Sequence, residues 1–351
     1  MSRNSILQSD CPMPKLNFDI ITLGHGSGGI LTNQLLDSGV FKLLGNELLD
    51  KRHDGATFQL NARVAMSTDS FVVSPIFFAG GNIGDLAVNG TVNDLAMCGA
   101  IPKYLSLSFI LEEGLKMEEF WEVLVAIKTA CEYAGVQVVT GDTKVVERGK
   151  GDKLFINTTG IGEVHPHASI DPLRVITGDK IILSGPPARH GVAIMSLRQG
   201  LEFETSITSD TRPLHRIILQ LLDTFGAEIH LLRDPTRGGI STVLNEIAKY
   251  GPNGIEINEH AIHIEEEVAG ACEMLGLDPL YVANEGLFIA VVHANAANAF
   301  LQQLQQWQHG AKAAIIGEVV VDHPGQVIMN SNIGGRRVIN MLSGEQLPRI
   351  C

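Results

Sequence analysis

Apolar residues along the chain follow helical spacing in some segments and strand-like runs in others, with glycine or proline between them. The clearest helix is predicted over 118–134, where apolar side chains recur around one face and Gly135 stands where a helix C-cap belongs. Further helices are predicted over 30–36, 84–97, 236–250 and 295–307, and strands over 64–68, 103–111, 136–139, 180–184, 287–292 and 314–321. This alternation predicts a mixed α/β fold.

Breaks in the pattern suggest four parts. We expect an N-terminal arm with a glycine-rich segment over 1–45, a first domain over 46–165, a second domain over 166–325 and a tail over 326–351. A length of 351 residues suits two compact lobes. The second lobe alternates helices and strands as an α/β sandwich does, and the polar, glycine-containing stretch after Pro324 predicts a mobile tail.

Composition indicates a folded protein, because 45% of the residues are apolar and 19% are charged. The net charge is −13, from 26 basic and 39 acidic residues, which disfavours binding to nucleic acid or to an anionic membrane. The longest apolar runs are far shorter than the ~20 residues of a membrane span, and residues 1–10 have no signal-peptide core. We therefore expect a cytoplasmic protein.

The five cysteines are an odd set without a CxxC pair, and one of them, Cys351, is the last residue. This usage argues against a disulfide framework and against a structural zinc site. An incidental terminal cysteine is one interpretation of Cys351. A prenylation signal is excluded, since its cysteine lies four residues from the end.

A glycine run over 23–29 precedes the helix predicted from residue 30. A glycine-rich loop that leads into a helix N-terminus can hold phosphate, and a flexible linker is an equal alternative on this pattern alone. The two histidines of His165-Pro166-His167 could hold a metal, but a surface loop between the lobes is the preferred interpretation.

Several carboxylates occupy positions where α/β proteins gather ligands. Asp94 lies within the apolar helix predicted over 84–97, whereas Asp69 and Asp142 are expected directly after strands. A carboxylate in an apolar helix is costly unless it is paired or bound to a cation, and oxygen ligands from separate elements suit Mg²⁺ with a nucleotide phosphate. Helix capping and solvent exposure are the simpler alternatives.

Taken together, the motifs resemble those of the ATP-dependent superfamily of aminoimidazole ribonucleotide synthetase, selenophosphate synthetase and thiamine-monophosphate kinase. The matching segments are His25–Gly29, Thr68–Ser70, Asn93–Met97, Gly141–Thr143, Asp234–Gly239 and Asn284–Gly286. Within the superfamily, the ending Pro348-Arg349-Ile350-Cys351 resembles the HypE family of carbamoyl dehydratases, which act in hydrogenase maturation. The segment around Cys11 shows no match to the catalytic Cys-Lys segment of selenophosphate synthetase.

The resemblance implies a homodimer in which the N-terminal lobes form a β-barrel-like interface, with ATP and Mg²⁺ bound between the lobes. The implied metal ligands are Asp69, Asp94, Asp142 and Asp234. The implied ATP-binding residues are Gly26, Ser27, Gly28, Gly29, Asn93, Thr143 and Lys144. The implied catalytic residues are Cys351, Lys144 and Glu285, with Glu285 as the candidate general base.

The implied reaction is the ATP-dependent dehydration of a carbamoyl group carried on the Cys351 thiol, which leaves a thiocyanate. The implied partners are the carbamoyltransferase HypF, which loads the thiol, and the HypC–HypD iron scaffold, which accepts cyanide for the [NiFe]-hydrogenase iron centre. Two alternatives remain. One is a synthetase or kinase of the superfamily that acts on a free small molecule, like selenophosphate synthetase, and the other is a scaffold that binds ATP without turning it over.

Overall fold

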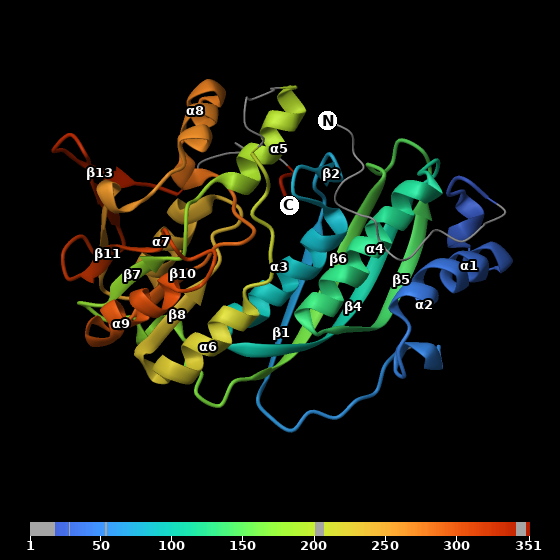
Figure 1. Ribbon diagram of the computed structural model, residues 1–351, viewed down its shortest axis with the longest axis horizontal. Coiled ribbons are helices and arrows are strands. Elements are labelled where there is room, and N and C mark those ends of the chain that lie inside the picture. Colours follow the sequence, from blue (N-terminus) through green and yellow to red (C-terminus); the bar gives the residue numbers. More distant parts are fainter. Residues whose placement is uncertain (1–17, 28, 53–54, 201–206, 342–348) are drawn as a thin grey trace.

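The computed structural model describes residues 18–27, 29–52, 55–200, 207–341 and 349–351, and it has two lobes that lie side by side (Figure 1). The first lobe contains η1 (Leu23–Gly26), α1 (Ile30–Leu35), η2 (Leu36–Val40), α2 (Phe41–Leu44), η3 (Leu49–Lys51), β1 (Val64–Phe71), β2 (Phe77–Phe78), β3 (Gly81–Asn82), α3 (Ile83–Met97), β4 (Ala100–Glu112), α4 (Met117–Ala134), β5 (Gln137–Val146) and β6 (Leu154–Val164). The second lobe contains η4 (Pro172–Arg174), β7 (Lys180–Leu183), α5 (Arg189–Gln199), α6 (His215–Phe225), η5 (Gly226–Glu228), β8 (Ile229–Arg233), α7 (Gly239–Tyr250), β9 (Gly254–Asn258), η6 (Glu259–Ala261), α8 (Glu266–Leu275), η7 (Pro279–Tyr281), β10 (Ile289–Val292), α9 (Ala294–Gln305), β11 (Ala314–Val320), β12 (Val327–Asn330) and β13 (Arg336–Ile339).

The first lobe is built on a four-stranded sheet in the order β1-β6-β4-β5, in which only β4 and β5 run parallel. Helices α3 and α4 cover one face (Figure 1), where Phe109 of β4 packs edge-on against Phe120 of α4. The opposite face is open, and it exposes the apolar side chains of Val64, Met66 and Ile110. In the single chain this sheet therefore ends in two edge strands, β1 and β5, and does not close into a barrel.

The second lobe is built on a seven-stranded sheet in the order β13-β12-β9-β11-β7-β10-β8. Successive residues of β7 face opposite layers: Ile181 belongs to the core with α7, and Ile182 belongs to the core with α6 and α9. Helices therefore cover both faces of a buried sheet, which confirms the predicted α/β sandwich.

The tail begins later than predicted, because the stretch after Pro324 contributes two strands to this sheet. Val327, Ile328 and Met329 are buried in β12, which pairs in parallel with β9, and β13 returns antiparallel beside it. The polar and glycine residues over 331–335 form the turn between the two strands. Assignment of 326–340 to a mobile tail is thus wrong, since long-range pairing with β9 orders a segment whose local sequence looks like a loop.

The last three residues return to the boundary between the lobes, where Figure 1 shows the C-terminus next to β2 and α5. Ile350 is only 2% exposed and belongs to the apolar core of the first lobe, together with Phe71 and Ile194. No helix in the described part of the chain is long and apolar enough to span a bilayer.

Candidate functional site

Three aspartates, on β1, on α3 and in the loop after β8, lie within electrostatic range of one another. Asp94 lies on α3 and accepts a 2.6 Å hydrogen bond from the hydroxyl of Ser67 on β1. Burial raises the pKa of Asp94, the Ser67 hydrogen bond lowers it, and the negative charge of Asp69 raises it again. Burial, followed by the charge of Asp94, raises the pKa of Asp234 to about 7. The charges of Asp69 and Asp94 thus act on neighbouring carboxylates, and the three aspartates are here called the acidic group.

Asp69 lies inside β1, although the sequence pattern predicted it just after a strand. The strand continues to Phe71 and pairs with β6 along its whole length, with Asp69 opposite Thr158. Burial is also the main cause that raises the pKa of Asp69. Asp69 therefore lies within an edge strand and not beyond its end.

The N-terminal capping of helix α3 does not involve Asp94. Asn82 caps the helix by accepting from the Gly84 N–H at 2.7 Å, and the Asp85 carboxylate accepts from the Asn82 N–H at 2.7 Å. Asp85 thus serves the capping alternative. Asp94 lies two turns further on, where most neighbouring side chains are buried.

Glu285 is buried beside the acidic group, and its Oε1 atom has no hydrogen-bond partner within the described residues. Burial raises its pKa well above the ordinary value, and the charges of Asp210, Asp234, Asp69 and Asp94 add to that effect. Asp210 fixes the backbone here, since its carboxylate accepts from the N–H groups of Glu285 and Gly286. The orientation of Glu285 is therefore set from the second lobe.

The chain ends next to these carboxylates. The carbonyl oxygen of Cys351 accepts from the Val72 N–H at 3.0 Å, and the carbonyl of Ile350 contacts His190 Nε2 at 2.8 Å. Arg349 is held through its guanidinium by the Val72 carbonyl and by an ion pair with Asp152. The tail end is thus docked by contacts from both lobes, through the backbone of Val72 and the side chain of His190.

The Cys351 thiol lies in the electrostatic range of Glu285, Arg237 and Asp69. Its pKa is raised to about 12: burial is the main cause, the charges of Glu285 and Asp69 contribute to the rise, and Arg237 opposes it. The docked thiol is therefore neutral at physiological pH. Arg237 belongs to the Asp234–Gly239 motif, but the sequence pattern predicted no role for it. Its position in this Asp-Pro-Thr-Arg-Gly-Gly turn is the sequence feature that could have indicated one.

A second group of predicted residues lies at the other edge of the sheet. Lys144 and Asp142 of β5 form a 2.7 Å ion pair, and both side chains are more than half exposed. The lysine contact is the main cause that lowers the pKa of Asp142. Asp142 also lies inside its strand and not after it, because β5 extends to Val146 in parallel register with β4.

The glycine-rich segment packs against this same edge. A Cβ on Gly26 would lie 2.6 Å from the Val145 amide nitrogen, so only glycine fits there. Ser27 donates to the Gly24 carbonyl at 2.9 Å, and Gly29 is the N-cap of α1. Gly28, also predicted to bind the nucleotide, lies outside the described residues. Together with Asp142, Thr143 and Lys144, this segment is here called the β5 group.

Within a single chain, the acidic group and the β5 group lie far apart. A row of paired residues crosses the sheet from Ser70 through Asn157 and Ser108 to Asp142. It spans three interstrand steps, about 14 Å at the usual strand spacing. The sequence predicted one nucleotide site from both groups, but the strand order places them at opposite edges.

Asn93 contributes to the site through the backbone of the second lobe. Its side-chain nitrogen donates to the carbonyls of Arg212 at 3.0 Å and Glu285 at 3.3 Å, and its oxygen accepts from the Leu214 N–H at 2.7 Å. The carboxamide therefore joins α3 to the Glu285 segment. Its predicted contact with the nucleotide stays a prediction.

The acidic group fits a hard divalent cation. It offers carboxylate oxygens from three elements. The charge of Asp69 raises the pKa of Asp94, and the charges of Asp94 and Asp69 raise that of Asp234, an effect that a bound cation would offset. The three aspartates are not drawn into a closed cage, and Mg²⁺ commonly takes only one or two carboxylates together with water and phosphate oxygens.

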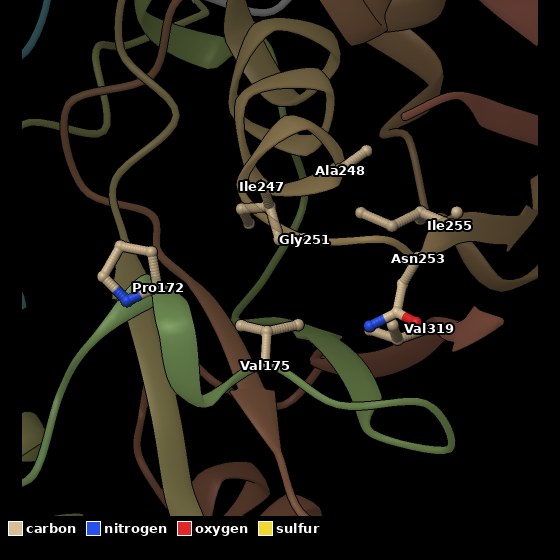
Figure 2. A pocket seen from close by; sticks show the side chains of 9 residues that line it. Pro172, Val175, Ile247, Ala248, Gly251, Asn253, Ile255 and Val319 are labelled. Atoms are coloured by element: carbon tan, nitrogen blue, oxygen red, sulfur yellow. The ribbon is translucent and has the colours of Figure 1, made fainter. Parts of the chain in front are cut away.

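The second lobe contains two hollows, of which only the smaller lies apart from this chemistry. Figure 2 shows the smaller one, of about 10 Å³, which is lined by apolar side chains such as Val175 and Ile247 and by Asn253. The larger one, about 200 Å³, is lined by Arg189, Arg212 and Lys312, and it borders Asp210 and Gly286. The apolar hollow has no group that could act in catalysis.

Comparison with known proteins gives matches along nearly the whole chain. Residues 52–164 match the model of the AIR synthase related protein N-terminal domain, and residues 177–330 match that of the C-terminal domain. A relative from Azotobacter vinelandii, the carbamoyl dehydratase HypE, is 51% identical over 334 residues, which cover 94% of this chain and 97% of the relative.

Solved structures agree. A crystal structure of hydrogenase maturation protein HypE in complex with ATP has a TM-score of 0.90 at 46% identity and covers 94% of this chain and 99% of its own. A chain from a HypE–HypF complex has a TM-score of 0.77 at 40% identity, with 90% of this chain and 100% of that chain covered.

Proposed function

The chain belongs to the AIR synthase related protein family and, within it, to the HypE carbamoyl dehydratases, and we propose that it uses ATP to dehydrate a carbamoyl group carried on its own Cys351. The observation that carries this proposal is the docking of the C-terminal thiol beside Glu285, Arg237 and Asp69. The relatives' names give the activity, and one relative binds ATP. The docked tail supplies the substrate position.

The proposed reaction has two steps. The carbamoyl oxygen on Cys351 attacks the γ-phosphorus of ATP, ADP leaves, and the nitrogen loses one proton. The C–O bond then breaks with release of phosphate, the second N–H proton is lost, and a thiocyanate remains on sulfur. Phosphorylation is needed because an amide oxygen is a poor leaving group, and in-line positioning supplies much of the rate.

Glu285 is proposed as the base that accepts protons from the carbamoyl nitrogen. Its Oε1 atom has no partner, and burial makes its ionised form a stronger base than an ordinary glutamate. Arg237 is the cation near the sulfur. Asp69, Asp94 and Asp234 would hold Mg²⁺, which when bound supplies positive charge to the transferring phosphate.

We further propose that the complete ATP site forms between two copies of the chain. The open face of the four-stranded sheet exposes Val64, Met66 and Ile110, which a second sheet can cover. Each copy would bring its β5 edge, with Lys144 and the glycine-rich segment, to the acidic group of the other. This arrangement explains why one chain holds the two groups about 14 Å apart.

A carrier thiol requires partners. Because a relative forms a complex with HypF, we propose that HypF loads Cys351 in this protein, and that the HypC–HypD scaffold accepts the cyanide. The docked thiol, with its pKa raised to about 12, is a poor nucleophile, so loading is proposed to take place after the tail has left this position. We also propose a cytoplasmic location, where ATP is available.

Intact-mass spectrometry tests the proposal with the full chain, the carbamoyltransferase, carbamoyl phosphate and ATP. One carbamoyl group should be added to Cys351, followed by loss of one water. Glu285→Gln keeps the shape of the side chain, so this variant should accept the carbamoyl group but not dehydrate it. Cys351→Ala should remain unmodified. An unmodified parent tail under conditions where the transferase is active would overturn the proposal.

ADP release separates this function from the alternatives. If the protein were a superfamily kinase or synthetase for a free small molecule, Cys351→Ala would turn over ATP as fast as the parent. If it were a scaffold, neither would release ADP. We expect parent turnover that depends on the loaded thiol.

A further inference from the structure

Two histidines and an aspartate, none of them in the acidic group, meet at the junction between the lobes. His165 and His167 follow β6, and Asp223 lies in the last turn of α6. One ligand atom from each of the three lies within 4.8 Å of the other two, a grouping that no other set of described residues makes. We propose that this cluster binds a late first-row divalent cation, of the Zn²⁺, Co²⁺ or Ni²⁺ class.

The backbone around the two histidines is already fixed. His165 donates its N–H to the Gly99 carbonyl at 2.9 Å, and the Ala168 N–H donates to the His165 carbonyl at 2.9 Å. Pro166 thus lies at the second position of a hydrogen-bonded turn, where its locked φ is favoured. The turn holds both imidazoles on the same short segment, so little backbone ordering would be required on binding.

The second lobe fixes the third ligand at the same place. His167 packs on Gly226, where a Cβ would lie 3.5 Å from the His167 Cβ, and Gly226 follows α6 directly. His165 Nε2 lies 3.2 Å from Asp223 Oδ1. In a tetrahedral zinc site with bonds of about 2.0–2.1 Å, neighbouring ligand atoms are about 3.3 Å apart. The observed contact is therefore close to one edge of such a site.

The donor types select the class of metal. Two imidazoles with one carboxylate suit Zn²⁺ and its neighbours in the first row, whereas Mg²⁺ prefers an all-oxygen set such as the acidic group. Three protein ligands leave a position for water or a further ligand. The 3.3 Å contact from the His167 N–H to His165 Nδ1 would be given up when His165 binds through Nε2, and it is a long hydrogen bond.

A cation here would link the lobes, because His165 directly follows the first-lobe strand β6 while Asp223 belongs to second-lobe helix α6. The simpler interpretation is a His165–Asp223 ion pair alone. It differs in what it requires of His167, whose side chain is exposed and has no part in that pair.

Titration of the full chain with Co²⁺ tests the proposal, in excess Mg²⁺ to saturate the acidic group. The parent should bind one equivalent and show the visible absorption band of a low-coordinate Co²⁺ site, which Zn²⁺ should displace. His167→Ala and Asp223→Asn change exposed side chains, and each should weaken Co²⁺ binding at least about tenfold. His263→Ala, an exposed histidine elsewhere in the second lobe, is the matched control.

Circular dichroism of each variant checks that its fold is kept. Zn²⁺ should raise the melting temperature of the parent and of His263→Ala, but not that of His167→Ala. Equal Co²⁺ affinity in the parent and in His167→Ala, or no binding by the parent, would overturn the proposal.

Discussion

His190 holds the carbonyl oxygen of Ile350 at 2.8 Å, across 160 positions of the chain. A carbonyl only accepts, so Nε2 carries the hydrogen and Nδ1 accepts from the Ser209 hydroxyl, also at 2.8 Å. Burial lowers the pKa of His190, which keeps the imidazole neutral. Asp210 follows Ser209 and fixes the backbone of Glu285, so the contacts that dock the tail are continuous with those that orient the proposed base.

His190→Ala should loosen the docked tail. Loss of a hydrogen bond to a buried carbonyl costs about 1–2 kcal/mol, which corresponds to an increase of roughly tenfold in the undocked population. Trypsin cleavage after Arg349, followed by mass spectrometry, measures that population. His260→Ala, an exposed histidine, should be cleaved at the parent rate, and cleavage of His190→Ala at that same rate would contradict the prediction.

Alkylation of Cys351 should depend on pH in an unusual way. The docked thiol has its pKa raised to about 12, so its thiolate fraction, and with it the alkylation rate, should keep rising about tenfold for each pH unit through pH 9 to 11. Ile350→Ala removes the buried anchor and should speed alkylation at pH 8. Iodoacetamide labelling with peptide mapping reads Cys351 separately from the other cysteines. A plateau near pH 9 in the parent would show that the thiol is not docked in solution.

Mg²⁺ should stabilise the protein most at alkaline pH. The folded pKa of Asp234 is raised to about 7 from 3.8, so the folded state holds a proton that the unfolded state releases, and stability falls as pH rises from about 4 through 7. In EDTA the melting temperature should therefore drop across this range, and Mg²⁺ should restore it at pH 8. Asp234→Asn removes one charge and should melt higher than the parent in EDTA, with little response to Mg²⁺. A parent that gains no stability from Mg²⁺ at pH 8 would contradict this view.

Two inactive variants should complement each other if the ATP site is shared between copies. Asp94→Asn damages the acidic group and Lys144→Ala damages the β5 group, so a mixed dimer contains one intact site. Random exchange of equal amounts should recover about one quarter of the parent ATP turnover, since half of the dimers are mixed and each has one working site. Asp94→Asn mixed with Asp234→Asn is the control, because no intact site can form. Absence of recovery after proven subunit exchange would place the whole site within one chain.

Local sequence was sufficient for much of the fold. The apolar face over 118–134 and the following Gly135 predicted α4, and Gly135 adopts the left-handed cap with φ of 71°. The two lobes and the sandwich of the second lobe also follow from alternation alone. A candidate site residue could be identified where a carboxylate stands in an apolar element, as Asp94 does on α3.

The remaining features depend on strand order and long-range pairing, which spacing does not encode. Asp69 and Asp142 look equivalent in sequence, but β6 and β4 lie between their strands and separate them. The strands β12 and β13 were missed because their order comes from β9, some seventy residues earlier in the chain. The juxtaposition of Asp223 with the His165 turn likewise arises only from packing of the two lobes.

Through Ile350, the docked tail fills part of the first-lobe core in addition to carrying Cys351. When Cys351 travels to another protein, Ile350 must leave the first-lobe core and about 2 kcal/mol of apolar burial is lost. The apolar core around Ile350, which includes Phe71, would then be partly open to water, so return of the tail to its docked position is favoured. A protein that offers Ile350 a comparable apolar surface would therefore favour release of the tail, and a purification tag fused after residue 351 should hinder its docking.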